Sequence, residues 1–295
     1  MLKKGTLWQN IVSTTERALR TGALFSYPTR VAYIDDGGMR FVVRVLAGLK
    51  RKQEERQKQD SAAGRGEKSD PFQPPEPDLV VADISATHTA LLNKFNVVDH
   101  HLLIITKNYE DQEELLTVGD FEALWTCMAE FEGLGFYNGG REGGASQPHK
   151  HLQMVRLPLA PQGPAIPIES LLASVNGNRV PGFPFLHAFE RLHRPLAVSP
   201  RDAARITFEL YGKMLQRVGM EPAADNILQR QSLPYCLLIA RGWMLLAPRS
   251  KEFFEDISFN SLAYAGSLFV WNEEQLERIR SSGPMRALAE VSVHQ

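Results

Sequence analysis

The sequence is poor in cysteine, with two cysteines among 295 residues. Cys127 and Cys236 each lie in an apolar stretch, and neither belongs to a CxxC motif or to another spacing typical of metal ligands. Free cysteines in such stretches are usually buried. We therefore predict two buried thiols, which argues against a cysteine-based metal site and fits a reducing compartment.

An excess of positive charge is also absent, because 33 lysine and arginine residues face 34 acidic residues, for a net charge of −1. This balance argues against a protein that mainly coats nucleic acid, and leaves open a local basic site for a small polyanion. No apolar run approaches the roughly 20 residues of a membrane-spanning helix, and the basic residues Lys3 and Lys4 precede no apolar signal segment. We expect a cytoplasmic protein whose partners include neither nucleic acid nor a membrane.

The residues that are present, 43% hydrophobic and 23% charged, are typical of a globular protein with a sizeable core. Residues 51–78 are rich in charge, glutamine, glycine and proline, and they predict a mobile surface loop, either a lid or plain disorder. Prolines between 158 and 184 predict a linker or a wrapped irregular segment. We therefore divide the chain into a catalytic domain at 1–165, which includes the loop, a proline-rich linker at 166–198 and a C-terminal region at 199–295.

Strand and helix patterns predict an α+β fold. Strand-like runs at 79–84, 90–94 and 102–106 have short connections, which favour antiparallel pairing over a βαβ crossover. A helix is predicted after Thr117, with Asp120 completing a capping box. Further predicted elements are the end of that helix at Gly133 and Gly135, strands at 136–138 and 154–157, a helix opened by Ser199 and Pro200, a hairpin around Arg241 and Gly242, and a helix at 272–280. We expect an antiparallel sheet with helices on one face, extended by a C-terminal α+β region.

The run His149-Lys150-His151-Leu152-Gln153 is the strongest functional motif. In a strand, residues two apart share a face, so His149, His151 and Gln153 would form one polar row. A neutral imidazole can attack phosphorus through one ring nitrogen while the other carries a proton and is held by an acceptor. A covalent intermediate divides one difficult displacement into two easier ones. The row therefore favours nucleotidyl transfer, with the Gln153 amide donating to a phosphate oxygen.

The segment before this row has the composition of a phosphate-binding loop. Glycines within 139–144 allow backbone N–H groups to approach phosphate oxygens closely. Ser146 and Gln147 add donors, and Arg141 and Lys150 are nearby cations. These residues are candidates for binding the substrate's phosphates.

The same histidine spacing has two other interpretations. Two histidines on one strand face can bind zinc, and His88, His100 and His101 are available as further ligands. The HxH pattern can also be incidental, because short motifs produce false matches. The tripeptide spacing alone does not decide between these interpretations.

The wider context resembles one known family. The matching runs are LNKFNVV (92–98), HLLIITK (101–107), FYNGG (136–140), GASQPHKHLQ (144–153) and RGWMLLAPRS (241–250). They resemble the diadenosine tetraphosphate (Ap4A) phosphorylases, also called ATP adenylyltransferases. That family is a transferase branch of the histidine triad (HIT) superfamily, related to galactose-1-phosphate uridylyltransferase. The resemblance implies a HIT-like sheet and the reversible reaction of Ap4A with phosphate to give ADP and ATP through an adenylyl-histidine.

The resemblance also implies roles for individual residues. His151 corresponds to the nucleophile, His149 supports it, and Gln153 stands where hydrolytic relatives carry a third histidine, which implies an acceptor other than water. The residues implied to bind the nucleotide and its phosphates are Asn93, Lys94, Asn138, Gly139, Ser146, Gln147 and Lys150. The implied partners are dinucleoside polyphosphates, ATP, ADP and phosphate. A substrate-associated Mg²⁺ is implied, without an organic cofactor or a metal held by the protein alone.

Several alternatives remain at the level of sequence. One is a related transferase that acts on a nucleotide sugar, another is a HIT-type hydrolase, and a third is a nucleotide-binding protein without turnover. Among single residues, Trp125 and Trp243 are expected in the core and His187 and His193 at the surface. Arg249 is expected to be an ordinary loop residue or to contact a distal phosphate.

Overall fold

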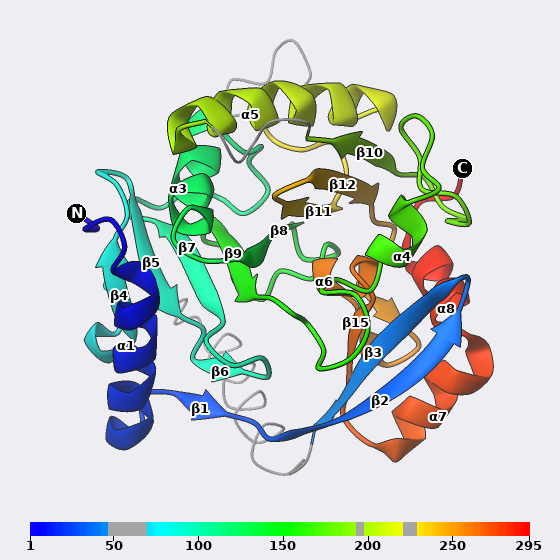
Figure 1. The fold of residues 1–295 in the computed structure, drawn as a ribbon, viewed down its shortest axis with the longest axis horizontal. Coiled ribbons are helices and arrows are strands. Elements are labelled where there is room, and N and C mark those ends of the chain that lie inside the picture. The colour runs from blue at the N-terminus through cyan, green and yellow to red at the C-terminus, as the bar shows by residue number, and fades with distance from the viewer. Residues whose placement is uncertain (47–69, 193–197, 221–228) are drawn as a thin grey trace.

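The computed structural model describes residues 1–46, 70–192, 198–220 and 229–295. Its centre is an eight-stranded antiparallel sheet with the order β10-β12-β11-β8-β9-β7-β5-β4 (Figure 1). The strands are β4 (Val80–Asp83), β5 (His88–Leu92), β7 (Leu102–Thr106), β8 (Gly133–Gly139), β9 (His151–Arg156), β10 (Ala188–Arg191), β11 (Tyr235–Ala240) and β12 (Trp243–Pro248). The prediction of an α+β fold built on an antiparallel sheet is confirmed.

Three helices cover one face of this sheet: α1 (Leu7–Thr21), α3 (Val118–Met128) and α5 (Pro200–Arg217). Alternate strand residues point toward them, among them Leu152 and Met154 of β9, which are fully buried in the same apolar cluster. Burying a side chain of this size contributes about 1.5–3 kcal/mol. The strand's other residues, His151 and Gln153, must therefore face the opposite side.

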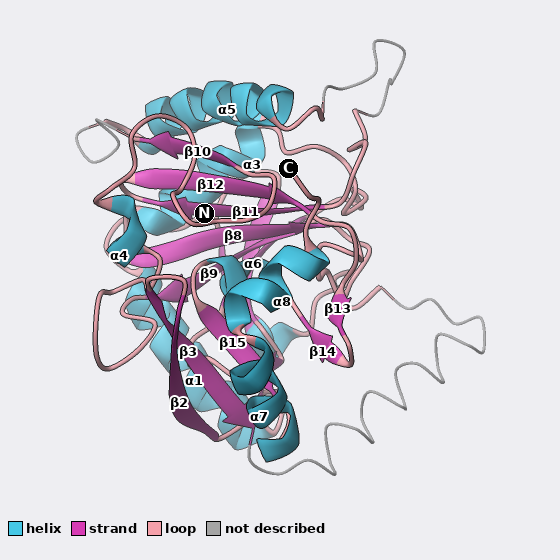
Figure 2. Ribbon diagram, turned by 90° about the vertical axis from the view of Figure 1, so that its right-hand side faces the viewer, coloured by secondary structure: helices cyan, strands magenta, loops and turns pink. Residues whose placement is uncertain are grey.

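The opposite face is covered by a smaller sheet, β15-β3-β2, and by the C-terminal helices. Figure 2 shows β2, β3 and α7 at the other end of the molecule from α5. Helices thus lie on both faces, whereas the sequence predicted them on one. The remaining elements are β1 (Phe25–Ser26), β2 (Thr29–Asp36), β3 (Met39–Leu46), η1 (Pro77–Leu79), β6 (Phe95–Asn96), α4 (Glu169–Leu172), β13 (Phe253–Phe254), β14 (Ile257–Ser258), α6 (Ser261–Tyr264), β15 (Ser267–Val270), α7 (Glu273–Ser282) and α8 (Pro284–Val291).

Local sequence patterns identified most helix starts correctly. Thr117 and Asp120 form the predicted capping box of α3, and the Ser199 side chain caps α5. The end predicted for α3 was wrong, because the helix stops at Met128 and the two glycines belong to β8. A Cβ atom at Gly135 would lie 2.8 Å from Leu124 Cδ1, so glycine allows α3 to pack closely on the strand.

The proline-rich segment is folded and contributes to the core. It supplies α4 and β10, and the β10 strand extends the main sheet through β12. His187 was expected at the surface but is buried, because its Nε2 accepts the Val180 N–H at 2.8 Å and its Nδ1 lies 2.8 Å from the Phe185 carbonyl oxygen. His193 lies outside the described residues.

Other predictions about burial are confirmed. Cys127 and Cys236 are buried free thiols, and Trp125 and Trp243 belong to the core. Across the described ranges, no helix combines the length and the apolar character that crossing a bilayer requires.

Candidate active site

Two members of the predicted polar row, His151 and Gln153, lie on β9, a central strand of the large sheet, whereas His149 precedes this strand. β9 pairs with β7 on one side, where His151 is opposite Ile105, and with β8 on the other, where Gln153 is opposite Phe136. The period-2 alternation of the strand turns both polar side chains away from the helices α3 and α5. The structure therefore confirms that His151 and Gln153 share one face of β9.

The hydrogen bonds of His151 fix its tautomer. Nδ1 lies 2.8 Å from the carbonyl oxygen of His149, which can only accept, so Nδ1 carries the proton. The backbone N–H of His151 donates to Gln112 Oε1 at 2.8 Å. Nε2 has no hydrogen-bond partner among the described residues and is not sealed from solvent, so its lone pair is free to attack. No motif in the sequence pointed to Gln112.

Burial also sets the charge of His151. The residue is 3% exposed, and desolvation lowers the pKa of its imidazole to about 4, assisted by the nearby His149 ring and opposed by the hydrogen bond to the His149 carbonyl. The ring is therefore neutral at pH 7, which is the protonation state a nucleophilic imidazole requires.

His149 is held on every side by its neighbours. The residue is 0% exposed, its Nδ1 lies 2.7 Å from Asp70 Oδ2, and its Nε2 lies 2.8 Å from the Thr106 carbonyl oxygen and 2.9 Å from Thr106 Oγ1. None of its ring nitrogens is free to act on a substrate. This geometry supports a role for His149 in holding His151 in place.

Phe72 forms an aromatic wall against the two histidines. Its ring packs edge-on against His149 and His151, with centroid separations of 5.5 Å in both cases. Asp70 and Phe72 belong to the predicted loop 51–78, whose residues 51–69 lie outside the described part. Within residues 70–78, Phe72 is buried and Asp70 contacts His149, so this end of the predicted loop lies against the histidines. No spacing rule in the sequence connects them to a motif about 80 residues away.

Gln153 lies beside a second neutral imidazole. Desolvation lowers the pKa of His101 to about 4, while the nearby Gln153 side chain opposes that effect. The Asn93 side chain accepts the Phe95 N–H at 3.3 Å, so its amide nitrogen, 3.2 Å from His101 Nδ1, is the donor. Asn93 therefore joins the site through His101, whereas Lys94 is half-exposed and paired with Glu76 at 2.6 Å.

Lys150 was selected as a phosphate ligand, and the structure places it away from the site. It is 0% exposed, and its Nζ donates to Glu110 Oε2 at 2.6 Å on the helix side of the sheet. Glu114 and Asp120 carboxylate oxygens lie 3.7 and 3.9 Å from the same nitrogen. The strand alternation that brings its two neighbours into the site turns Lys150 the opposite way.

The remaining predicted phosphate ligands surround the glycine turn after β8. Asn138 is buried and its Oδ1 accepts the N–H and the hydroxyl of Ser261 at 2.9 and 2.7 Å, so its side chain ties β8 to α6. A Cβ atom at Gly139 would lie 2.6 Å from the ring of the buried Tyr235, which explains the glycine. Ser146 is exposed and Gln147 half-buried, which leaves both accessible to a ligand.

The zinc interpretation finds no support in the described ranges, where no group of three or more His, Cys, Asp or Glu residues could hold a metal ion. His88 instead pairs with the buried Asp120 at 3.0 Å, and His100 Nδ1 lies 3.0 Å from the Thr15 hydroxyl. Arg249 is also unavailable to a phosphate, because it is 1% exposed and donates to backbone carbonyls.

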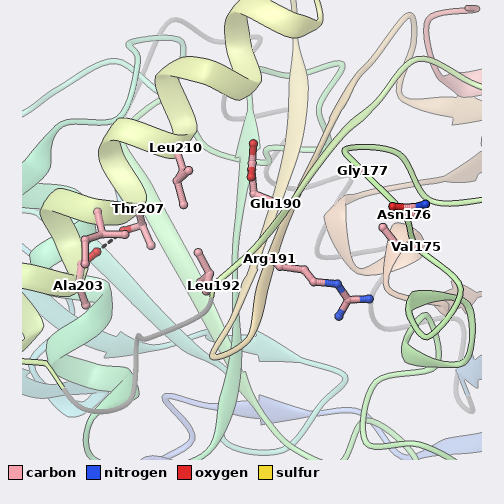
Figure 3. Close-up of a pocket in the computed structure, with 10 residues that line it drawn as sticks. Val175, Asn176, Gly177, Glu190, Arg191, Leu192, Ala203, Thr207 and Leu210 are labelled. Atoms are coloured by element: carbon pink, nitrogen blue, oxygen red, sulfur yellow. Dashed lines mark hydrogen bonds between the residues drawn. The ribbon is translucent and has the colours of Figure 1, made fainter.

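A separate cavity of about 650 Å³ lies between α5, β10 and residues 175–177 (Figure 3). Its charged side chains have partners elsewhere in the protein, since Glu190 accepts from Arg217 and Arg191 donates to the Leu172 carbonyl. None of the residues selected for the site lines this cavity. This cavity is therefore separate from the candidate site at β9.

The lowered pKa values of the His101 and His151 imidazoles predict how stability depends on pH. In the unfolded chain His101 and His151 would bind a proton near pH 6.5, whereas in the fold each stays neutral until about pH 4. The unfolded state therefore binds more protons between these values, and stability falls as the pH is lowered through this window. We expect each ring to contribute a loss of about 3 kcal/mol in the free energy of unfolding.

Urea unfolding at several pH values from 7.5 to about 4.5 tests this expectation, because the denaturant midpoint follows stability. The variant His151→Gln should show a shallower decline than the wild type. Equal declines for the two proteins would mean that His151 titrates normally in the fold.

Comparison with known proteins identifies the family. Residues 1–174 match the model of the Ap4A phosphorylase N-terminal domain, and residues 181–294 match that of the ATP adenylyltransferase C-terminal domain. Diadenosine 5',5'''-P1,P4-tetraphosphate phosphorylase 2 of Saccharomyces cerevisiae is 28% identical over 238 residues, which cover 71% of each protein. Protein APA1 of the same yeast is 28% identical over 237 residues, which cover 72% of each.

Solved structures show the same fold. The crystal structure of yeast Ap4A phosphorylase Apa2 has a TM-score of 0.78 at 23% identity, covering 99% of this chain and 95% of that chain. The structure of Apa2 in complex with Ap4A has a TM-score of 0.77 at 22% identity, covering 100% and 99% of the two chains. With the N-terminal family model matching more than half of its length and the C-terminal model most of the rest, this chain belongs to the Ap4A phosphorylase family.

Proposed function

We propose that this protein is an Ap4A phosphorylase, which converts Ap4A and phosphate into ADP and ATP, reversibly, through an adenylyl group carried on His151. The observation that carries the proposal is the geometry of that ring: it is neutral, its Nδ1 is held by a carbonyl oxygen and its Nε2 is free. The family membership and the yeast phosphorylase crystallised with Ap4A support the choice of substrate.

The first chemical step forms the intermediate. His151 Nε2 attacks the α-phosphorus of one adenosine, the bond from that phosphorus to the bridging oxygen breaks, and ATP leaves with the bonding electrons. The positive charge that develops on the imidazole is stabilised by the His149 carbonyl at Nδ1. Covalent capture of this kind lowers the barrier by dividing the displacement into two steps.

The second step returns the enzyme to its starting state. A phosphate oxygen attacks the adenylyl phosphorus, the nitrogen–phosphorus bond breaks, and ADP is released with neutral His151 restored. Gln153 is an amide and cannot take a proton from water at neutral pH, so it can donate to a phosphate oxygen without activating water. This chemistry supports phosphate, rather than water, as the acceptor.

A divalent cation, Mg²⁺, is part of the proposal as a companion of the polyphosphate, where it would neutralise charge on the leaving triphosphate. Because no three-ligand cluster exists in the described ranges, the substrate's own oxygens would supply most of its ligands. A cytoplasmic location is likewise proposed, on the support of the two buried, unpaired thiols.

The proposal is tested by incubating the protein with Ap4A, phosphate and Mg²⁺ and separating the products. We expect ADP and ATP in equal amounts, with a rate that requires phosphate. Formation of AMP and ATP without added phosphate would show a hydrolase, and adduct formation only from a nucleotide sugar would show the related transferase. Mass spectrometry of an acid-labile, base-stable AMP adduct should locate it on His151.

A further inference from the structure

Asp70 connects the histidine pair to the residues that follow the undescribed part of the loop. One carboxylate oxygen, Oδ2, lies 2.7 Å from His149 Nδ1, and the other, Oδ1, accepts the backbone N–H of Phe72 at 2.9 Å. The side chain of Asp70 is 21% exposed, whereas the His149 ring beside it is completely buried. A single carboxylate therefore orients both the supporting histidine and the aromatic wall.

Hydrogen bonds hold both ring nitrogens of His149. Nδ1 lies 2.7 Å from Asp70 Oδ2, a carboxylate oxygen that accepts from it. Nε2 lies 2.8 Å from the carbonyl oxygen of Thr106 and 2.9 Å from its hydroxyl. Asp70 is the one charged group among these partners, so the hydrogen bond at Nδ1 is the charge-assisted one.

The position of His149 is transmitted to the nucleophile through its backbone. The carbonyl oxygen of His149 accepts the Nδ1 proton of His151, and this bond leaves the lone pair of Nε2 free. The Phe72 ring, placed by its own hydrogen bond to Asp70, packs against His151 and contributes to its desolvation. Loss of the Asp70 carboxylate would disturb both contacts of His151 at once.

The geometry points to Asp70 as a positioning residue for adenylyl transfer, which acts by holding His149 against the nucleophile. This inference rests on the proposed function and adds to it a residue outside the HxHxQ motif. Asp70 does not contact the reacting atoms, because its carboxylate is bound to His149 and Phe72.

The kinetic test compares Asp70→Asn and Asp70→Glu with a matched control, Asp78→Asn. Asp78 belongs to the same segment, but its Oδ1 lies 3.6 Å from Nε of the half-exposed Arg17, away from the histidines. In a single turnover with Ap4A, we expect Asp70→Asn to slow ATP release about 10- to 100-fold, as is typical when the group orienting a functional histidine is lost. Asp70→Glu should recover part of that loss, and the dissociation constant of Ap4A should change less than about threefold in each variant.

A spectroscopic test does not depend on turnover. Nitrogen-15 NMR of the wild-type protein should show Nδ1 of His149 as a hydrogen-bonded donor, and Asp70→Asn should shift that signal while Asp78→Asn leaves it in place. Equal rates for Asp70→Asn and Asp78→Asn, or an unchanged Nδ1 signal in Asp70→Asn, would overturn the assignment. A wild-type protein that leaves Ap4A intact would refute the proposed function, while the Nδ1 signal would still report the contact between Asp70 and His149.

Discussion

Replacing His151 by alanine is expected to reduce the turnover of Ap4A by on the order of 10⁴-fold or more, because the covalent route then has no nucleophile. The ring is only 3% exposed, so it offers little surface to a bound nucleotide. Ap4A affinity should therefore remain within about threefold of the wild type, and the loss should appear in kcat rather than in KM. Steady-state kinetics together with calorimetric titration of Ap4A separate the two effects.

His294→Ala provides the control, since it removes an exposed imidazole close to the C-terminus. We expect it to retain the wild-type rate. If His151→Ala kept more than a tenth of that rate, the nucleophile would have to be another group. A loss of Ap4A binding together with turnover would indicate instead that the ring holds the substrate.

The second large effect concerns stability. Arg249 is buried and has no ion-pair partner in the described part of the chain, and its guanidinium donates to the backbone carbonyls of Val291, Phe259, Lys251 and Glu252 at 2.7 to 3.1 Å. Arg249→Met would fill much of the volume and leave these acceptors without donors. Because each buried unsatisfied group costs about 1–3 kcal/mol, we expect the free energy of unfolding to fall by about 3–5 kcal/mol.

Urea unfolding measures this loss, and Arg280→Met is the matched control. Arg280 pairs with Glu277 on an exposed part of α7, where a single ion pair contributes about 0–1 kcal/mol. An Arg249→Met protein with wild-type stability and a raised KM for phosphate would restore the alternative in which this residue contacts a distal phosphate.

Much of the site could be predicted because its chemistry is local in sequence. The alternation of β9 places His151 and Gln153 on one face, and alternation depends only on residues two apart. The same rule turns Lys150 toward Glu110, and the error was to treat nearness along the chain as nearness in space. The helix caps at Thr117 and Ser199 were predicted for the same local reason.

The parts that could not be predicted depend on contacts between distant segments. Asp70 reaches His149 across 79 positions, and Ser261 reaches Asn138 across 123. Whether Arg249 is a ligand or a structural residue is decided by loops that fold around it from three parts of the C-terminal region. A periodicity or a spacing carries no information on such encounters, which are fixed only when the sheet and its two layers assemble.

The pairing of β11 with β8 joins the two family segments inside a single hydrogen-bonded ladder, with Tyr235 opposite Gly139 and Cys236 opposite Asn138. If the protein were cut between residues 174 and 181 and the two halves were separated, β8 would become an unpaired edge strand in one half and β11 in the other. Exposed edge strands tend to pair with strands of other molecules. The β8 edge and the β11 edge would pair best with each other, because they are hydrogen-bonded in the intact protein. The two family segments are therefore parts of one folding unit. The segment that carries His151 needs β11 of the other segment to complete its sheet, and neither segment has a complete structure of its own.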